Sequence, residues 1–307
     1  MSLLDLLNRR RSVRHYDENQ PIDADVVKEC LQAAQLAPTS SNMQLYELYH
    51  VTDPAVLNKL AAACMHQQAA KTAQQMVVFV TRQDLYRRRA KAALEFERGN
   101  VERNSPAEKQ KDRIKNWEMY YTKAMPLLYA RCFGLLGASR AAMANCAGLF
   151  VPMMREVSEH DYRVVVHKSC GLVAQTFMLA MTEAGYDTCP MEGFDSHRVK
   201  KLLGLPRNVE INMVVACGIR KPGHGIWGER FLDALRLYTY DASFRMHGVR
   251  AHADHRARQR DRLMPHRAER HRQERDGNLL ARRQQHVHLT RIMVRILVYA
   301  ARQLDEI

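Results

Sequence analysis

The sequence has few of the features that mark a secreted, membrane-spanning or metal-binding protein. Its seven cysteines are odd in number and never form a C-x-x-C pair, which favours reduced thiols and predicts no metal site. No run of about 18 uncharged apolar residues is present, so we expect no membrane span. Residues 1–5 lack the features of a signal peptide, and we therefore expect a cytoplasmic protein.

Composition instead predicts a folded body with a distinct tail. Hydrophobic residues make up 46% of the 307 residues, which suffices for a sizeable core. Residues 1–231 hold 31 basic and 24 acidic residues (+7), and residues 232–307 hold 16 and 9 (also +7). All 16 basic residues of 232–307 are arginine, and 7 of the 14 histidines lie there too. We therefore predict one domain over 1–231 and an Arg/His-rich tail over 232–307.

Three interpretations of the tail stay open. Arginine-rich segments bind phosphates, which would make it a nucleic-acid or acidic-partner arm. It could also be a disordered extension, or the out-of-frame translation of a GC-rich gene, which would favour Arg, Ala and His and exclude Lys. Acidic residues interleave with the arginines and aromatic residues are few, so we favour the last two and do not expect nucleic-acid binding. Residues 289–304 carry a weak amphipathic-helix pattern.

The body alternates helical and strand patterns, which is typical of an α+β domain with a helix-flanked sheet. Helices are expected over 2–9, from 23 to before Pro38, and over 54–64, 161–185 and 196–203. Strands are expected over 45–51, 76–81, 188–192 and 210–218. Residues 82–125 are charged and helical in tendency, with breaks expected at 99–100 and 104–106.

Four short segments carry groups suited to binding a ligand. Residues 9–14 place four guanidinium groups and a hydroxyl together, and arginine forks suit phosphate. Residues 37–44 offer short hydroxyl and amide side chains to a polar heterocycle. Residues 189–194 end a strand at a glycine, where backbone approaches a flat ligand closely. Residues 218–225 add two cations after the last strand of the body.

In this order the segments resemble the FMN-dependent nitroreductase family. The matching pieces are RRSVRHYD…PI, APTSSNMQ, CPMEGFD and VVACGIRKPGH, and the resemblance covers roughly residues 1–231. It implies an α+β sandwich with a mixed central sheet flanked by helices. It also implies an intertwined homodimer with two FMN sites at the interface.

The resemblance also implies which residues bind FMN. Arg11 and Ser12 would lie near the phosphate and ribityl chain, with Arg10 among the same contacts and Arg14 near the N1/O2 edge of the ring. The other subunit would contribute Pro38, Thr39, Ser40 and Asn42. Glu192 and Gly193 would lie against the ring, and Arg220 and Lys221 near the phosphate. Gln67 is a further candidate, although residues 66–68 depart from the family pattern.

The implied reaction is ping-pong hydride transfer from NAD(P)H through FMN to a nitroaromatic, quinone or related acceptor. Since the chemistry resides on FMN, no side chain is expected to be catalytic. Residues 82–125 exceed what the family needs and form either a lid over the flavin or a helical hairpin packed on the dimer surface. As a lid, they would bring Trp117, Tyr120, Tyr121 and Lys123 to a substrate.

Two alternative functions remain. Some lid-bearing relatives catalyse reductive dehalogenation of aromatic amino acids or fragmentation of the flavin ring. A non-enzymatic, arginine-rich nucleic-acid-binding protein is the second alternative, and it predicts salt-dependent retention that depends on residues 232–307.

Overall fold

The computed structural model describes residues 2–226, 228–232, 235–240 and 246–251. One compact unit holds the described residues up to Ile226, and a second holds those that follow. In the second unit, β5 (Leu235–Tyr240) and β6 (Met246–Ala251) pair antiparallel. The predictions for the rest of 232–307, the 289–304 helix included, lie outside the described residues.

The first unit is built on a four-stranded sheet with the order β1-β2-β4-β3. Its strands are β1 (Tyr46–Val51), β2 (Gln75–Thr81), β3 (Asp187–Met191) and β4 (Glu210–Gly218). All three strand pairs are antiparallel, and among the described residues the one parallel pairing is a bridge between Ser12 and Thr188. The expected mixed sheet is therefore wrong for the four strands, because each joins its neighbours antiparallel.

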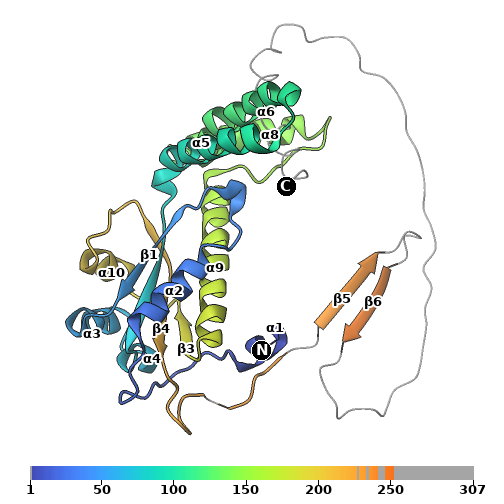
Figure 1. Ribbon diagram of the computed structural model, residues 1–307. Helices are drawn as coiled ribbons and strands as arrows, with labels where there is room; N and C mark the ends of the chain where they lie inside the picture. The colour runs from blue at the N-terminus through green and yellow to red at the C-terminus, as the bar shows by residue number, and fades with distance from the viewer. Residues whose placement is uncertain (1, 227, 233–234, 241–245, 252–307) are drawn as a thin grey trace, which may run out of the picture. The chain divides into compact units, whose positions relative to one another are not determined.

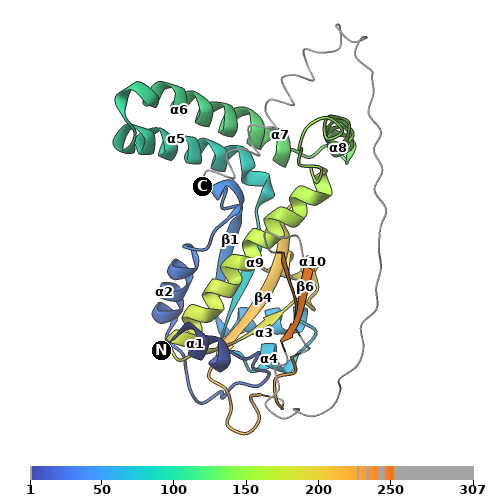
Figure 2. The same ribbon diagram turned by 90° about the vertical axis from the view of Figure 1, so that its right-hand side faces the viewer.

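Side chains of β2 alternate between two cores, and this explains its continuous apolar run. Met76, Val78 and Val80 face one core, and Val77 and Phe79 face the other. The first core is covered by α3 (Pro54–Ala63), α4 (Gln68–Lys71) and α10 (Ser196–Leu202), and the second by α2 (Ala24–Ala34) and α9 (Glu159–Glu183). Figures 1 and 2 show these helices on opposite faces of the sheet.

In the described part of the chain, α9 is the single helix long and apolar enough to cross a membrane by length and composition. Nine of its residues are buried, among them Val173, Phe177 and Met181, which pack in the core that the sheet shares with α2. Core helices of soluble proteins pass the same test. Packing against the sheet therefore accounts for the apolar character of α9.

The chain makes a long helical excursion between β2 and β3. It comprises α5 (Tyr86–Asn104), α6 (Ala107–Met119), a π-helical turn (Tyr120–Ala124), α7 (Met125–Tyr129) and α8 (Leu135–Ala147). Helices α5 and α6 form a hairpin that extends away from the sheet (Figure 2). Helix α8 was not predicted.

The predicted break at residues 99–100 is wrong, because α5 continues through both. Asn100 Nδ2 donates to Glu97 Oε2 at 3.0 Å, and Asn104 Nδ2 donates to Asn100 Oδ1 at 2.7 Å. These contacts join residues one turn apart and offset the low helix propensity of glycine and asparagine. The break expected at 104–106 is confirmed, since α5 ends at Asn104 and α6 begins after Pro106.

A carboxylate ties this excursion to the sheet. Glu210, the first residue of β4, bonds Arg163 Nε and lies 3.1 Å from His167 Nε2, both on α9. Arg131, from the segment before α8, lies 3.5 Å from its other oxygen. Hydrogen bonds from His167 and Arg163 outweigh burial and lower the pKa of Glu210 to about 2.

We expect Glu210→Gln to weaken the fold near neutral pH more than in acid. Because the folded-state pKa of Glu210 is depressed, its contribution is present above the ordinary value of 4.5 and is lost as pH falls toward 2. The variant should lose about 2 kcal/mol of unfolding free energy at neutral pH, and this deficit should shrink in acid. Urea denaturation at a series of pH values measures it. The exposed Glu95→Gln is the control, and a deficit independent of pH contradicts the assignment.

Candidate functional site

Three of the predicted segments meet at the edge strand β3. The Val13 N–H donates to the Thr188 carbonyl at 3.1 Å, and Ser12 forms the parallel bridge to Thr188. The Arg14 N–H donates to the Gly225 carbonyl at 2.8 Å. Backbone pairing therefore places residues 10–14 between β3 and the loop that follows β4.

An ion pair holds this junction. The Arg220 guanidinium binds the Asp187 carboxylate through Nη2 and through Nε, which lies 3.0 Å from each oxygen. The Arg220 N–H also donates to Asp187 Oδ2 at 2.8 Å, and Nη2 donates to the Arg9 carbonyl at 3.2 Å. Arg220 thus joins the end of β4, the start of β3 and the end of α1 (Leu3–Arg9). Its guanidinium is committed to protein partners.

Gln67 lies at the other end of β3. Its Nε2 donates to the Gly193 carbonyl at 2.7 Å, which connects the start of α4 to the turn after β3. Glu192 and Gly193 are exposed in that turn. The structure therefore brings Gln67 into contact with Gly193, the glycine predicted to lie against a flat ligand. It does so although residues 66–68 depart from the family pattern.

The junction is rich in cations and donors. Lys221 and Arg14 are exposed, and Arg10 is half-buried. Burial raises the pKa of the Cys189 thiol, and Arg14 and Arg10 oppose that rise, which reflects their proximity to β3. The buried Thr188 Oγ1 has no hydrogen-bond partner among the described residues. Such a set suits an anionic, oxygen-rich ligand.

The fourth segment, residues 37–44, contains a strained turn before β1. Ser41, Asn42 and Gln44 adopt positive φ values of 53°, 48° and 46°, which non-glycine residues rarely adopt. The Tyr120 hydroxyl lies 2.6 Å from Ser41 Oγ, and the Tyr121 hydroxyl donates to the Ser41 carbonyl at 3.2 Å. Two buried tyrosines therefore hold the turn in place.

This turn lies far from the β3 junction within one chain. The Ser40 N–H donates to Ser169 Oγ on α9 at 3.1 Å. The Arg9 guanidinium instead lies beside Gly185, just past the end of α9. Ser169 precedes Glu183, the last residue of α9, by 14 residues, which corresponds to about 21 Å along a helix. Residues 38–42 and residues 10–14 of one chain are therefore well separated.

The aromatic residues predicted to contact a substrate serve mainly as core. Tyr120 and Tyr121 are 1% and 4% exposed, and Trp117 stacks on Tyr121 with ring centroids 5.6 Å apart. As a lid, the segment would bring both tyrosines to a substrate, whereas in the structure they face the Ser41 turn and the core at the root of the hairpin. Lys123 is exposed.

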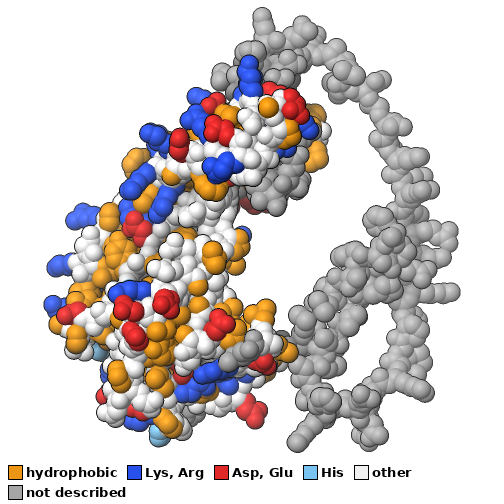
Figure 3. Space-filling model, viewed as in Figure 1, with side chains coloured by type: hydrophobic (Ala, Val, Ile, Leu, Met, Phe, Trp, Pro, Cys, Tyr) orange, Lys and Arg blue, Asp and Glu red, His pale blue; other side chains and the backbone are white. Residues whose placement is uncertain are grey.

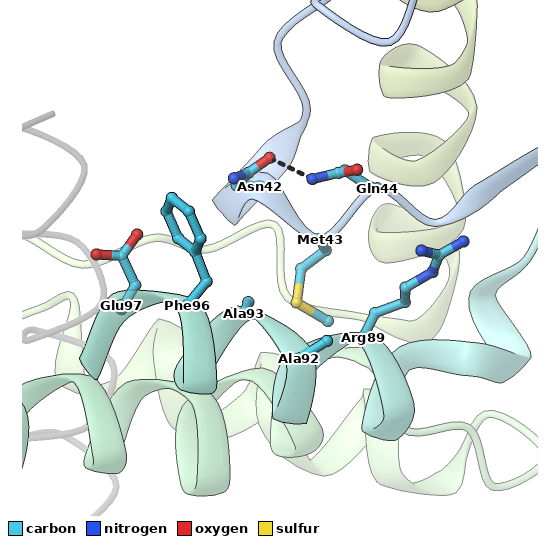
Figure 4. Close-up of a pocket in the computed structure, with 8 residues that line it drawn as sticks. All are labelled: Asn42, Met43, Gln44, Arg89, Ala92, Ala93, Phe96 and Glu97. Carbon is cyan, nitrogen blue, oxygen red and sulfur yellow. Dashed lines mark hydrogen bonds between the residues drawn. The ribbon is translucent and has the colours of Figure 1, made fainter. Parts of the chain in front are cut away.

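A pocket of about 380 Å³ lies between the strained turn and α5. Figure 4 shows the eight residues that line it: Asn42, Met43, Gln44, Arg89, Ala92, Ala93, Phe96 and Glu97. The sequence predicts Asn42 as a binding residue but gives no signal for Arg89 or Phe96. Figure 3 shows positively and negatively charged side chains on the surface of the hairpin. In the sequence, this charge makes α5 resemble an ordinary solvent-exposed helix.

No group of metal-ligating side chains occurs among the described residues.

Solved structures define the class of fold. A nitroreductase-like protein from Streptococcus mutans aligns with a TM-score of 0.51 at 21% identity, over 75% of this chain and 93% of that one. A nitroreductase-type protein from Exiguobacterium sibiricum, in complex with FMN, aligns with a TM-score of 0.52 at 19% identity, over 76% and 94%. The α+β fold is therefore nitroreductase-like.

Sequence comparison gives the family. The nitroreductase family model matches residues 7–219, so the chain belongs to the nitroreductase family. Protein DrgA from Synechocystis is 28% identical over 220 residues, covering 72% of this chain and 85% of that protein. An NADH dehydrogenase from Thermus thermophilus is 29% identical over 212 residues, covering 68% and 82%.

Proposed function

We propose that the protein is an FMN-dependent oxidoreductase that works as a homodimer and transfers hydride equivalents from NAD(P)H to a nitroaromatic, quinone or related acceptor. The observation that carries this proposal is the meeting of residues 10–14, Thr188 and the 220–225 loop at one edge of the sheet. The FMN complex of the Exiguobacterium protein and the NADH dehydrogenase of Thermus support it. A cytoplasmic location is part of the same proposal.

The residues at the junction fit FMN chemically. Lys221, Arg10 and Arg11 would bind the phosphate, and the Ser12 hydroxyl would bind the ribityl chain. The buried Thr188 Oγ1, which lacks a partner among the described residues, offers a further polar contact. Arg220 would act by positioning residues 9–14 through the Arg9 carbonyl, because Asp187 holds its guanidinium.

The remaining residues would orient the ring. Arg14 would place a cation near the N1/O2 edge, where negative charge develops on reduction. The backbone of Glu192 and Gly193 would lie against the ring, and Gln67 fixes Gly193 through its carbonyl. When bound, FMN would supply the hydride-transfer chemistry between the nicotinamide and the acceptor, so no catalytic side chain is required.

The homodimer would complete the site. Pro38, Thr39, Ser40 and Asn42 lie too far from residues 10–14 of their own chain to share a small ligand, so we assign them to the flavin bound by the partner subunit. The strained turn suits this role, because its hydrogen bonds to Tyr120 and Tyr121 hold the polar groups in place before FMN binds.

An anaerobic absorption spectrum tests this function. The purified protein, loaded with FMN, should show flavin bands that bleach on addition of NADH or NADPH and return on addition of a quinone. Size-exclusion chromatography with light scattering should give twice the 35.4 kDa chain mass. A protein that cannot be loaded with FMN would contradict the assignment, and so would bound flavin that neither nucleotide reduces.

A further inference from the structure

We propose that the pocket between the strained turn and α5 binds a planar aromatic acceptor that carries a carboxylate, and that Arg89 selects for this charge. The inference rests on the proposed function, which places Asn42, a residue of the pocket wall, beside the flavin. It adds to that function the chemical class of the acceptor and the residue that recognises it.

One face of α5 forms the floor of the pocket. Arg89, Ala92, Ala93 and Phe96 are spaced three and four residues apart and therefore lie on one face of α5. The two alanines leave room above the helix, and the Phe96 ring, 60% exposed, rises at one end of the floor (Figure 4). An aromatic ring seated on the alanines would meet Phe96 edge-on or offset-stacked.

The pocket has a positively charged side chain at one end and a negatively charged one at the other. Arg89 is half-buried at one end, and it has no ion pair or hydrogen bond among the described residues. Two other arginines near it are engaged: Arg82 binds Glu47 and Asp84, and Arg98 binds Glu118. Glu97 lies at the opposite end, beyond Phe96 (Figure 4). A carboxylate would therefore point toward Arg89 and away from Glu97.

The wall opposite α5 is polar and rigid. Gln44 Nε2 donates to Asn42 Oδ1 at 3.0 Å, and both residues belong to the turn with positive φ values. Met43, only 1% exposed, closes the pocket between this wall and the helix. A preformed wall of this kind orients a ligand with little loss of conformational entropy.

The test compares two acceptors of similar size that differ in charge, 4-nitrobenzoate and 4-nitrobenzamide. With the FMN-loaded protein, Arg89→Gln should lower kcat/KM for 4-nitrobenzoate by about tenfold or more, because a charge-assisted contact is lost. The value for 4-nitrobenzamide should change by less than about twofold. Arg88→Gln is the matched control: Arg88 is exposed on the same helix and does not line the pocket.

A binding measurement separates this inference from the proposed function. Calorimetric titration with benzoate, which the flavin does not reduce, should show a Kd about tenfold weaker in Arg89→Gln, with no such change in Arg88→Gln. Flavin that bleaches normally while both acceptors and benzoate are unaffected by Arg89→Gln overturns the inference alone. Equal losses for the two acceptors also overturn it. Bound flavin that NAD(P)H does not reduce overturns the proposed function, and benzoate binding then decides the inference.

Discussion

Replacing Arg220 by alanine is expected to lower the free energy of unfolding by about 2 kcal/mol, because it leaves the Asp187 carboxylate without its cation. The Asp187 side chain is only 10% exposed, so water solvates it poorly once the guanidinium is gone. The Arg220 side chain is 33% exposed, which reduces the loss below that of a fully buried pair. Urea denaturation of the flavin-free protein measures the change.

The double variant Arg220→Ala/Asp187→Asn distinguishes the ion pair from other effects of truncation. Without the carboxylate, no unpaired charge remains, and the double variant should recover about half of the stability lost by Arg220→Ala alone. Additive losses from the two changes would show that the pair contributes nothing specific.

The single variant Arg220→Ala should also weaken FMN binding, by about tenfold or more. Arg220 Nη2 donates to the Arg9 carbonyl and so positions residues 10–14. Quenching of FMN fluorescence on binding gives the dissociation constant. Lys221→Gln is the matched comparison, because it removes a neighbouring cation that is exposed. It should weaken FMN binding while leaving the unfolding free energy unchanged. If Lys221→Gln destabilises the fold as Arg220→Ala does, the two residues do not have the separate roles assigned here.

The sheet could be predicted from sequence because its strands carry strong local signals. The apolar run in β2 is buried along its whole length, and the four predicted strands match β1, β2, β3 and β4 to within one residue at each end. Strand direction could not be predicted in the same way. It depends on which strands become neighbours, and β2 and β4 pair across more than 120 residues of chain.

The helical excursion was predicted less well because tertiary contacts override its local signals. Gly99 suggested a break, yet the side chains of Asn100 and Asn104 support the helix across it. Tyr120 and Tyr121 suggested a substrate surface, since exposed and buried aromatic residues look alike in sequence. Their burial follows from packing against the Ser41 turn, which is about 80 residues earlier in the chain.

The candidate site, too, could be predicted from the sequence only in part. Its segments could be predicted because each concentrates unusual side chains in a few residues, as 10–14 and 220–221 do. Asp187 could not, because it is a single acidic residue whose partner is 33 positions later. Arg89 was not predicted because it lines a pocket only once the turn at residues 42–44 lies opposite α5, more than 40 residues earlier in the chain. No pattern within α5 reports that contact.

Gly218→Ala is expected to be the most damaging single methyl addition in the sheet. A Cβ at residue 218 would lie 2.7 Å and 2.8 Å from ring carbons of Tyr16 and 3.0 Å from its Cβ. Tyr16 is fully buried, its hydroxyl donates to the Ala216 carbonyl at 2.9 Å, and its N–H donates to Thr72 Oγ1 at 3.0 Å. The ring cannot move aside without breaking these bonds, so we expect a loss of about 3 kcal/mol.

Gly99→Ala provides the matched control, because its added methyl also meets an atom closer than 3.0 Å, at 2.9 Å. That atom is Nη1 of Arg103, the far end of a flexible side chain, which moves aside at little cost. Since alanine favours the helix interior over glycine, this variant should gain up to about 1 kcal/mol. Thermal and urea denaturation measure both variants. A loss of unfolding free energy in Gly218→Ala together with a gain in Gly99→Ala would show that the rigidity of Tyr16, and not the closeness of the contact, makes Gly218 necessary. The residues just before Tyr16 depend on that rigidity for their place beside β3.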